Sequence, residues 1–193
     1  LIIRGVTVID GTGGPPTGPA DVIVEGNRIV RVQNVGYPGL PIKEERRPKN
    51  ATREIDAHGH YLMPGIVDMH AHTGGATKAP HMEYTYKLWM AHGITTVRGV
   101  PTAAVDLAIS EKERSAANAI TAPRMFCYQF FGDGKEWQER GIKSPEDARE
   151  WVRYIRGRGA DGLKLFALPP AIMEATLDEA RKLKIGSTAH LHQ

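Results

Sequence analysis

The sequence predicts an α/β fold built on a parallel sheet and preceded by a smaller β-rich segment. Two observations support this. From residue 62 onward, β-branched runs alternate with segments of helical periodicity, and the links between them are short. Before residue 62, the apolar runs are strand-like and are separated by Gly- and Pro-rich turns. We therefore expect two domains, residues 1–61 and 62–193, with a parallel sheet in the second that is either open or closed into a barrel.

The first segment reads as short strands joined by turns. The initial run is rich in β-branched residues and ends at a turn cluster over 11–16. Two later runs flank Gly26 and Asn27, a pair that tolerates positive φ, and this pattern predicts a β-hairpin. A Pro-rich, charged loop is expected over 34–53. The expected strands cover residues 1–10, 21–25, 28–32 and 55–57.

In the second segment, helix-terminal residues mark the helices between strands. Ser144 followed by Pro145 is typical of a helix N-terminus, and Gly93 and Gly157 are suited to helix C-termini. The expected strands are a run ending at His72 and residues 94–98, 124–130, 162–166 and 185–190. The expected helices cover residues 82–91, 103–119, 145–156 and 170–184.

Composition excludes two classes of partner. Hydrophobic residues make up 41% of the chain, but no apolar run approaches the roughly 18 residues of a membrane span. The net charge is only +3, and basic residues are interleaved with acidic ones, so we expect no nucleic-acid surface.

The single cysteine, Cys127, excludes an internal disulfide. Residue 1 is leucine, so we expect the natural start to lie upstream, and the cellular compartment is left open.

Two histidines at the end of a strand are the first candidate for chemistry. His70 and His72 are two residues apart, so in a strand their side chains project from the same face. Neighbouring imidazoles at the end of a buried strand suit a divalent metal such as zinc. The alternative is that both are ordinary surface or core histidines.

Lys164 and His190 extend this candidate site. Functional side chains of α/β barrels lie at the carboxyl ends of the strands, and both residues fall in later strands of the predicted sheet. Lys164 stands between two leucines, where desolvation would lower its pKa and leave a neutral, nucleophilic amine. Such an amine can add carbon dioxide, and the resulting carbamate can bridge two metals. The alternative is a lysine that reaches solvent from an edge strand or pairs with Asp161.

Five sequence blocks together resemble the amidohydrolase superfamily, and in particular its imidazolonepropionase-like and prolidase-like metal hydrolases. They occur in the expected order along nearly the whole chain. The blocks are Val8 to Gly13, Pro64 to His72, His92 to Arg98, Asp161 to Phe166 and Thr188 to His192. The resemblance implies a (β/α)8 TIM-barrel metal hydrolase with a small N-terminal β-sandwich domain. About five of the barrel strands are present in this chain.

The resemblance also implies roles for individual residues. His70 and His72 would bind the more buried of two divalent metals, expected to be zinc. Lys164, as a carbamate, would bridge both metals, and His190 would hold the second. Asp68 has the parity of the two histidines, and we expect it to support a ligand rather than to bind metal itself.

Other polar residues are weaker candidates. His192 shares the parity of His190, but the family pattern favours His190 as the ligand. Arg98 could bind a substrate carboxylate or form a structural ion pair. His58, His60, His81 and His92 are most simply turn, loop or helix-end residues.

The implied function is metal-dependent hydrolysis of a carbon–nitrogen bond in a small-molecule amide, such as a dipeptide, an N-acyl amino acid or a cyclic amide. The enzymatic alternative is a mononuclear deaminase of the same superfamily. Such enzymes do not use a lysine at the position of Lys164, so this residue is what separates the two readings. The resemblance places a further histidine after the sixth barrel strand and a proton-shuttling aspartate after the eighth, both beyond residue 193. A complete barrel needs about 250 residues.

We therefore expect this chain alone to be inactive. We also expect either a homo-oligomer or a second chain that carries the missing half of the barrel. A non-catalytic fragment or binding subunit is the remaining alternative.

Overall fold

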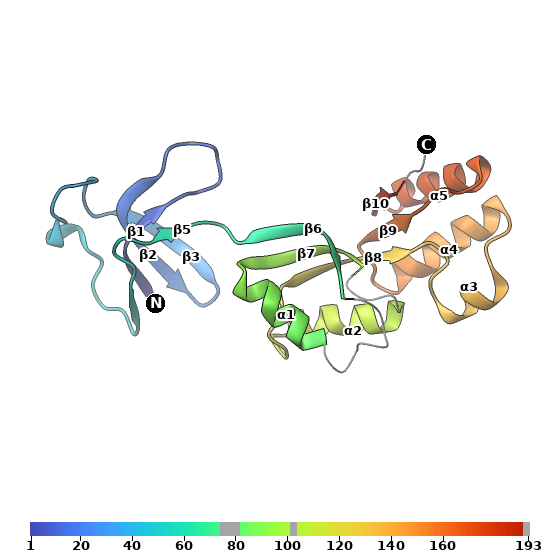
Figure 1. Ribbon diagram of the computed structural model, residues 1–193, viewed down its shortest axis with the longest axis horizontal. Coiled ribbons are helices and arrows are strands. Elements are labelled where there is room, and N and C mark those ends of the chain that lie inside the picture. The colour runs from blue at the N-terminus through green and yellow to red at the C-terminus, as the bar shows by residue number, and fades with distance from the viewer. Residues whose placement is uncertain (74–81, 101–103, 191–193) are drawn as a thin grey trace. The chain divides into compact units, whose positions relative to one another are not determined.

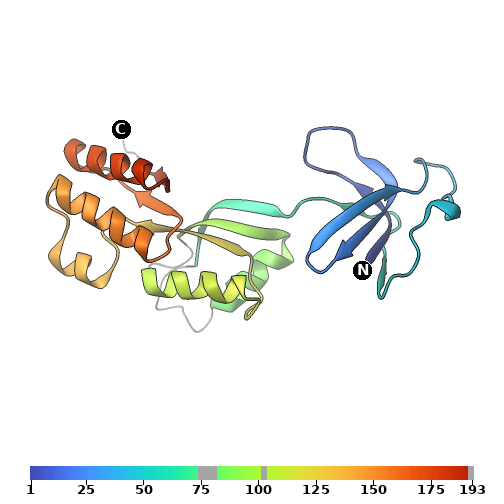
Figure 2. The same ribbon diagram turned by 180° about the vertical axis from the view of Figure 1, so that it is seen from behind.

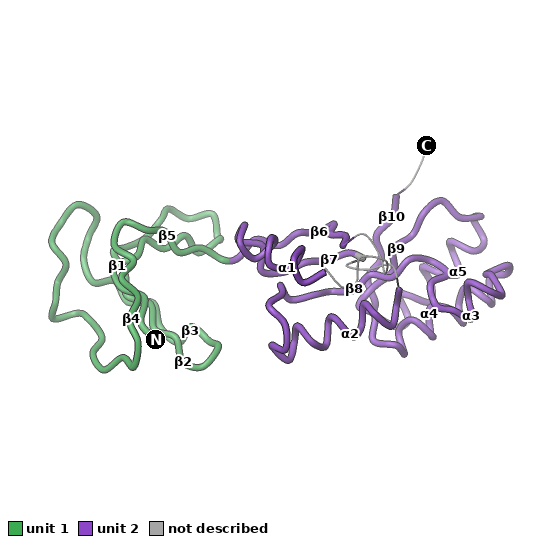
Figure 3. Tube along the Cα trace, turned by 60° about the horizontal axis from the view of Figure 1, so that its bottom comes forward, with its two compact units in different colours: residues 1–64 green, residues 65–193 purple. Residues whose placement is uncertain are grey.

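The computed structural model describes residues 1–73, 82–100 and 104–190, and the chain divides into two compact units, residues 1–64 and 65–193 (Figure 3). Each unit contains its own five-stranded sheet. In the described part of the chain, no helix is both long enough and apolar enough to cross a membrane.

The first unit is a mixed sheet whose strands follow the order β3-β2-β1-β4, with β5 also beside β1. The predicted hairpin is confirmed, because Glu25 pairs with Arg28 across a turn in which Gly26 has φ of 58°. Val6 and Val22 lie at its core. The strands are β1 (Ile2–Val8), β2 (Thr17–Glu25), β3 (Arg28–Asn34), β4 (Glu54–Asp56) and β5 (Tyr61–Leu62).

The second unit alternates strands with helices, and its strands follow the order β10-β9-β8-β7-β6 with every neighbouring pair parallel (Figure 1). The predicted parallel α/β sheet is therefore confirmed. Its strands are β6 (Ile66–His72), β7 (Ile94–Val100), β8 (Arg124–Phe130), β9 (Gly162–Leu165) and β10 (Gly186–Ala189). Its helices are α1 (Met82–Ala91), α2 (Val105–Ala116), α3 (Lys135–Arg140), α4 (Pro145–Gly157) and α5 (Pro170–Lys182).

Alternating side chains bury one face of this sheet beneath the helices. Leu163 and Leu165 of β9 pack with Trp151 and Ile155 of α4 in one buried cluster. A second cluster joins β7 and β8 to the helices at the other end of the sheet, and includes Cys127. Figure 2 shows the same helices from behind. Because strand side chains alternate in direction, Lys164 must point away from the helices, towards the opposite face.

Two glycines open space on that opposite face. A Cβ atom on Gly162 would lie 2.4 Å from the Tyr128 ring, and one on Gly186 would lie 2.3 Å from its hydroxyl. The tyrosine therefore occupies the space that side chains on β9 and β10 would otherwise fill. The guanidinium of Arg98 lies over the same ring, 4.9 Å from its centroid.

The start of α4 agrees with its sequence. The Ser144 side chain accepts a hydrogen bond from the Asp147 backbone N–H, and the Asp147 carboxylate accepts one from the Ser144 N–H. This reciprocal capping box satisfies backbone donors that a helix start leaves unpaired. Pro145 occupies the first turn. The short helix α3 was not predicted, since its six residues carry too short a pattern to show helical periodicity.

We expect Ser144→Ala to lower the free energy of unfolding by about 1 kcal/mol, because it removes the cap acceptor and leaves a backbone N–H unpaired. Chemical denaturation measures the change. Ser110→Ala is the matched control, because Ser110 is an exposed residue inside α2, where alanine is at least as favourable as serine. Equal losses in the two variants would contradict the capping role.

Candidate metal centre

The four predicted ligands lie together at the carboxyl ends of strands in the second unit. His70 and His72 end β6, Lys164 belongs to β9, and His190 directly follows β10. β6 and β9 are not neighbours in the sheet, since β7 and β8 separate them. Side chains from these two strands can meet only if the sheet curls. The parallel strands therefore form part of a barrel wall rather than a flat sheet.

Three distances define the cluster. The Nζ atom of Lys164 lies 3.0 Å from Nε2 of His70, and 94 residues separate the two in the sequence. The ring centroid of His70 lies 4.9 Å from that of His72 and 5.0 Å from that of His190. His70 is thus the central member of the group.

Lys164 is the most constrained of the four. It is 3% exposed, and its strand β9 lies between β8 and β10, so it does not reach solvent from an edge. Asp161 instead pairs with Lys112 at 2.8 Å and accepts a hydrogen bond from the Cys127 backbone. Burial, and then repulsion from Arg98, lower the pKa of Lys164 below its ordinary value. Its described surroundings favour the neutral amine.

The electrostatics of His72 reflect the same crowding. Its pKa lies below the ordinary value, first because of burial and then because of the positive charges that His70, Lys164 and His190 can carry. A lowered pKa keeps an imidazole neutral near pH 7, and only the neutral ring has a lone pair for a metal.

Asp68 contacts the cluster through the backbone. Its Oδ1 atom accepts a hydrogen bond from the backbone N–H of His70 at 2.9 Å. This contact fixes the main chain from which the His70 ring projects. The interaction agrees with a supporting position, although the chemical roles of these residues remain predictions.

The other histidines have local partners or lie outside the described residues. In the first unit, His58 contacts Asp56 and Arg47, and His60 contacts the His58 carbonyl. His92 contacts the Leu88 carbonyl at the end of α1. His81 and His192 lie outside the described residues, so the choice between His190 and His192 stays a prediction.

The donor set fits a divalent transition metal in chemical type, because it combines three imidazoles with an amine whose pKa is lowered by burial. Within the described ranges, however, no group of three or more His, Cys, Asp or Glu side chains is arranged to hold a metal ion. The described side chains therefore supply a cluster of nitrogen donors and not a finished coordination shell.

Two aromatic residues beside this cluster were not selected from the sequence. Phe130 ends β8, and Phe166 directly follows β9. The Phe130 ring centroid lies 6.2 Å from that of His72, and the Phe166 centroid lies 5.8 Å from that of His190. Their parity relative to Lys164 could have identified them, because Phe166 is two residues further along and Phe130 pairs with Lys164 in the sheet.

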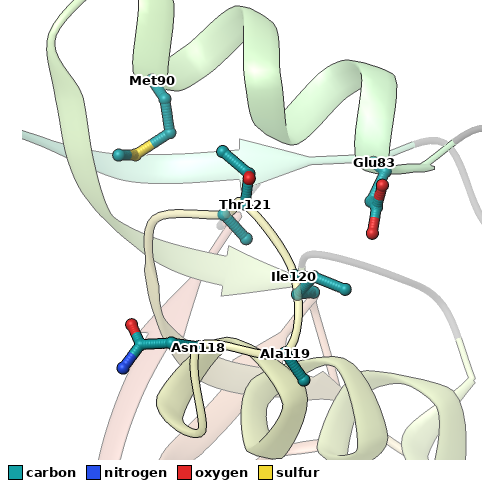
Figure 4. Close-up of a pocket in the computed structure, with 7 residues that line it drawn as sticks. Glu83, Met90, Asn118, Ala119, Ile120 and Thr121 are labelled. Atoms are coloured by element: carbon teal, nitrogen blue, oxygen red, sulfur yellow. The ribbon is translucent and has the colours of Figure 1, made fainter.

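A surface pocket lies away from these residues. It has a volume of about 450 Å³ and opens between α1 and the loop that follows α2 (Figure 4). None of the predicted ligands lines it. Its lining residues are Glu83, Met90, Asn118, Ala119, Ile120, Thr121 and Ala122.

Known proteins resemble the chain both in sequence and in structure. N-acyl-D-aspartate deacylase from Alcaligenes xylosoxydans xylosoxydans is 40% identical over 98 residues, which are 50% of this chain and 16% of the deacylase. 5-methylthioadenosine/S-adenosylhomocysteine deaminase from Desulforudis audaxviator is 26% identical over the whole of this chain and 49% of its own length. No protein-family model matches.

Among solved structures, Aspergillus niger ochratoxinase superimposes on 99% of this chain and 55% of its own, with a TM-score of 0.72 and 19% identity. The homologues and structural neighbours of this chain are members of the amidohydrolase superfamily. The chain spans about half the length of the relatives that it matches from end to end. The expected fold class, part of a TIM barrel with a separate small β domain, is thereby confirmed.

We expect Lys164→Met to raise the free energy of unfolding of the metal-free protein by about 1–2 kcal/mol, because it replaces a desolvated amine with an apolar chain of similar length. Denaturation in the presence of a chelator measures this. Lys87→Met is the control, since the Lys87 side chain is 56% exposed and its loss should change stability by less than about 0.5 kcal/mol. A strongly destabilised Lys164→Met variant would show that the amine supports the fold.

Proposed function

We propose that the complete protein is a metal-dependent hydrolase that cleaves a carbon–nitrogen bond in a small-molecule amide. The observation that carries the proposal is the buried Lys164, 3.0 Å from His70, within a group of three histidines at the carboxyl ends of barrel strands. A buried lysine with no carboxylate partner among the described residues is costly to fold, so its position calls for a functional reason.

In this proposal, His70, His72, His190 and Lys164 hold two divalent metals, with zinc as the expected ion. The three histidines contribute neutral imidazole nitrogens. The neutral Lys164 amine attacks carbon dioxide, a nitrogen–carbon bond forms and the amine loses a proton, which leaves a carbamate anion. Asp68 holds the His70 backbone in place. When bound, the metals supply an acidified water and polarise the scissile carbonyl.

The names of the relatives support the reaction class. A deacylase of an N-acyl amino acid and a deaminase both break a carbon–nitrogen bond. Among candidate substrates we keep dipeptides, N-acyl amino acids and cyclic amides. Within this class, the loops that follow the barrel strands select the substrate.

A deaminase with a single metal is the second candidate. It is favoured by the deaminase that matches this chain along its whole length. The two candidates differ in what they require of Lys164, because only a bridged pair of metals needs a carbamate there. Ammonia release and the number of bound metals therefore separate them.

We also propose that further strands complete the barrel, either from the same polypeptide or from a partner chain. In the described sheet, β6 and β10 are the edge strands. Ile66, Val67 and Met69 of β6 are each at least half exposed, which is unusual for apolar residues of a parallel sheet. Intact mass and oligomeric state of the natural protein test this.

We expect Lys164→Ala in the complete protein to remove bridged metal binding and turnover together, because no other side chain on β9 can replace the carbamate. Elemental analysis gives the metal content, and ¹³C NMR after exposure to ¹³C-bicarbonate detects the carbamate. Lys87→Ala, at an exposed position on α1, is the control. Full activity in Lys164→Ala would refute the proposed role, whereas one metal without a carbamate in the wild type would favour the deaminase.

A further inference from the structure

A row of four near-parallel rings crosses the candidate metal centre. Neighbouring centroids are 6.2 Å apart for His72 and Phe130, 5.8 Å for Phe130 and Phe166, and 5.8 Å for Phe166 and His190. The corresponding planes differ by only 19°, 19° and 17°. All three spacings fall in the range of offset-stacked aromatic pairs. We call these four residues the ring row.

The ring row separates the histidines into two kinds. His72 and His190 stack at its ends, one against each phenylalanine. His70 lies outside it and is inclined by 61° to His72 and by 46° to His190. His70 instead has two polar anchors, the Lys164 amine at its ring and the Asp68 carboxylate at its backbone. His72 and His190 are thus the two histidines of the cluster whose imidazole faces stack on a phenyl ring.

Ring orientation matters because an imidazole binds a metal through a lone pair in the plane of the ring. Rotating the ring about its bond to Cβ sweeps that lone pair away from the metal. Rotation of this kind is only weakly restricted in a free histidine side chain. A phenyl ring stacked on the imidazole face opposes the rotation and leaves the nitrogen-bearing edge accessible.

Core packing does not account for the two phenylalanines. Neither Phe130 nor Phe166 belongs to the hydrophobic clusters formed by the described residues, although Phe131 does. Phe166 is 42% exposed. Their rings contact each other and the two histidines.

We propose that Phe130 and Phe166 are positioning residues that fix the imidazole planes of His72 and His190 for metal binding. The inference rests on the proposed function, because it assumes that these histidines are ligands. The inference adds two residues to the four proposed ligands. These two residues would touch neither the metal nor the reacting atoms. Contact with an apolar part of the substrate is the competing role.

The test compares Phe130→Leu and Phe166→Leu in the complete protein with two kinds of reference. Phe130→Tyr and Phe166→Tyr keep an aromatic face and should restore binding. Phe126→Leu is the matched control, because Phe126 lies on β8 with the parity of Phe130 and is 41% exposed. Its ring does not stack on a histidine among the described residues. Zinc affinity is measured by competition with a chromophoric chelator, and the cobalt-substituted protein is examined by visible absorption.

We expect each leucine variant to bind zinc about tenfold more weakly and to change the cobalt absorption, since both depend on ligand orientation. The tyrosine variants and Phe126→Leu should match the wild type. Melting of the metal-free proteins checks folding, and Phe166→Met replaces Phe166→Leu if the latter does not fold.

Unchanged zinc affinity and cobalt absorption in both leucine variants would overturn the inference, and a raised KM alone would assign the rings to substrate contact instead. Equal losses in Phe126→Leu would also overturn it. A wild-type protein that binds no zinc would refute the proposed function itself, so the two failures are distinguishable.

Discussion

The curl of the parallel sheet is the constraint on which the candidate site depends. His70 on β6 and Lys164 on β9 are separated by two intervening strands, yet their nitrogen atoms are 3.0 Å apart. A flat sheet would hold strands three positions apart at roughly 14 Å, given the usual spacing of neighbouring strands. Twist and curvature of the sheet therefore bring together two side chains that are far apart in the sequence. The same curvature directs the helix-facing residues outward into two hydrophobic clusters.

Burial of Lys164 is expected to lower the stability of the fold, and it is also the condition on which the proposed carbamate depends. Leu163 and Leu165 on either side of it are almost fully buried on the helix face, so β9 is held firmly and the lysine cannot leave the sheet. The fixed backbone holds the amine in a position where burial lowers its pKa. A lysine on a rigid central strand has a better defined direction than one on a loop.

Features that depend on residues close together in the chain are predicted well from the sequence. Contacts between side chains on different strands are predicted poorly. The expected strand over 124–130 coincides with β8, and the Gly26–Asn27 hairpin and the Ser144 helix start are confirmed. All three depend on residues close together in the chain. The contact of His70 with Lys164 depends on sheet curvature, and the ring row depends on four strands at once, because its residues end or directly follow β6, β8, β9 and β10. Neither has a local pattern, although side-chain parity indicated that the ligands share one face.

Assembly of the site and folding of the second unit are consequently the same event. The nitrogen donors come from β6, β9 and the residue after β10, and the stacked phenylalanines come from β8 and the end of β9. In an unfolded chain these groups have no fixed relation, because 94 residues separate His70 from Lys164. A metal that binds them binds only the folded arrangement, and its binding free energy then adds to the stability of the fold. We expect that contribution to offset the cost of desolvating the Lys164 amine, so that bound metal would stabilise the folded second unit.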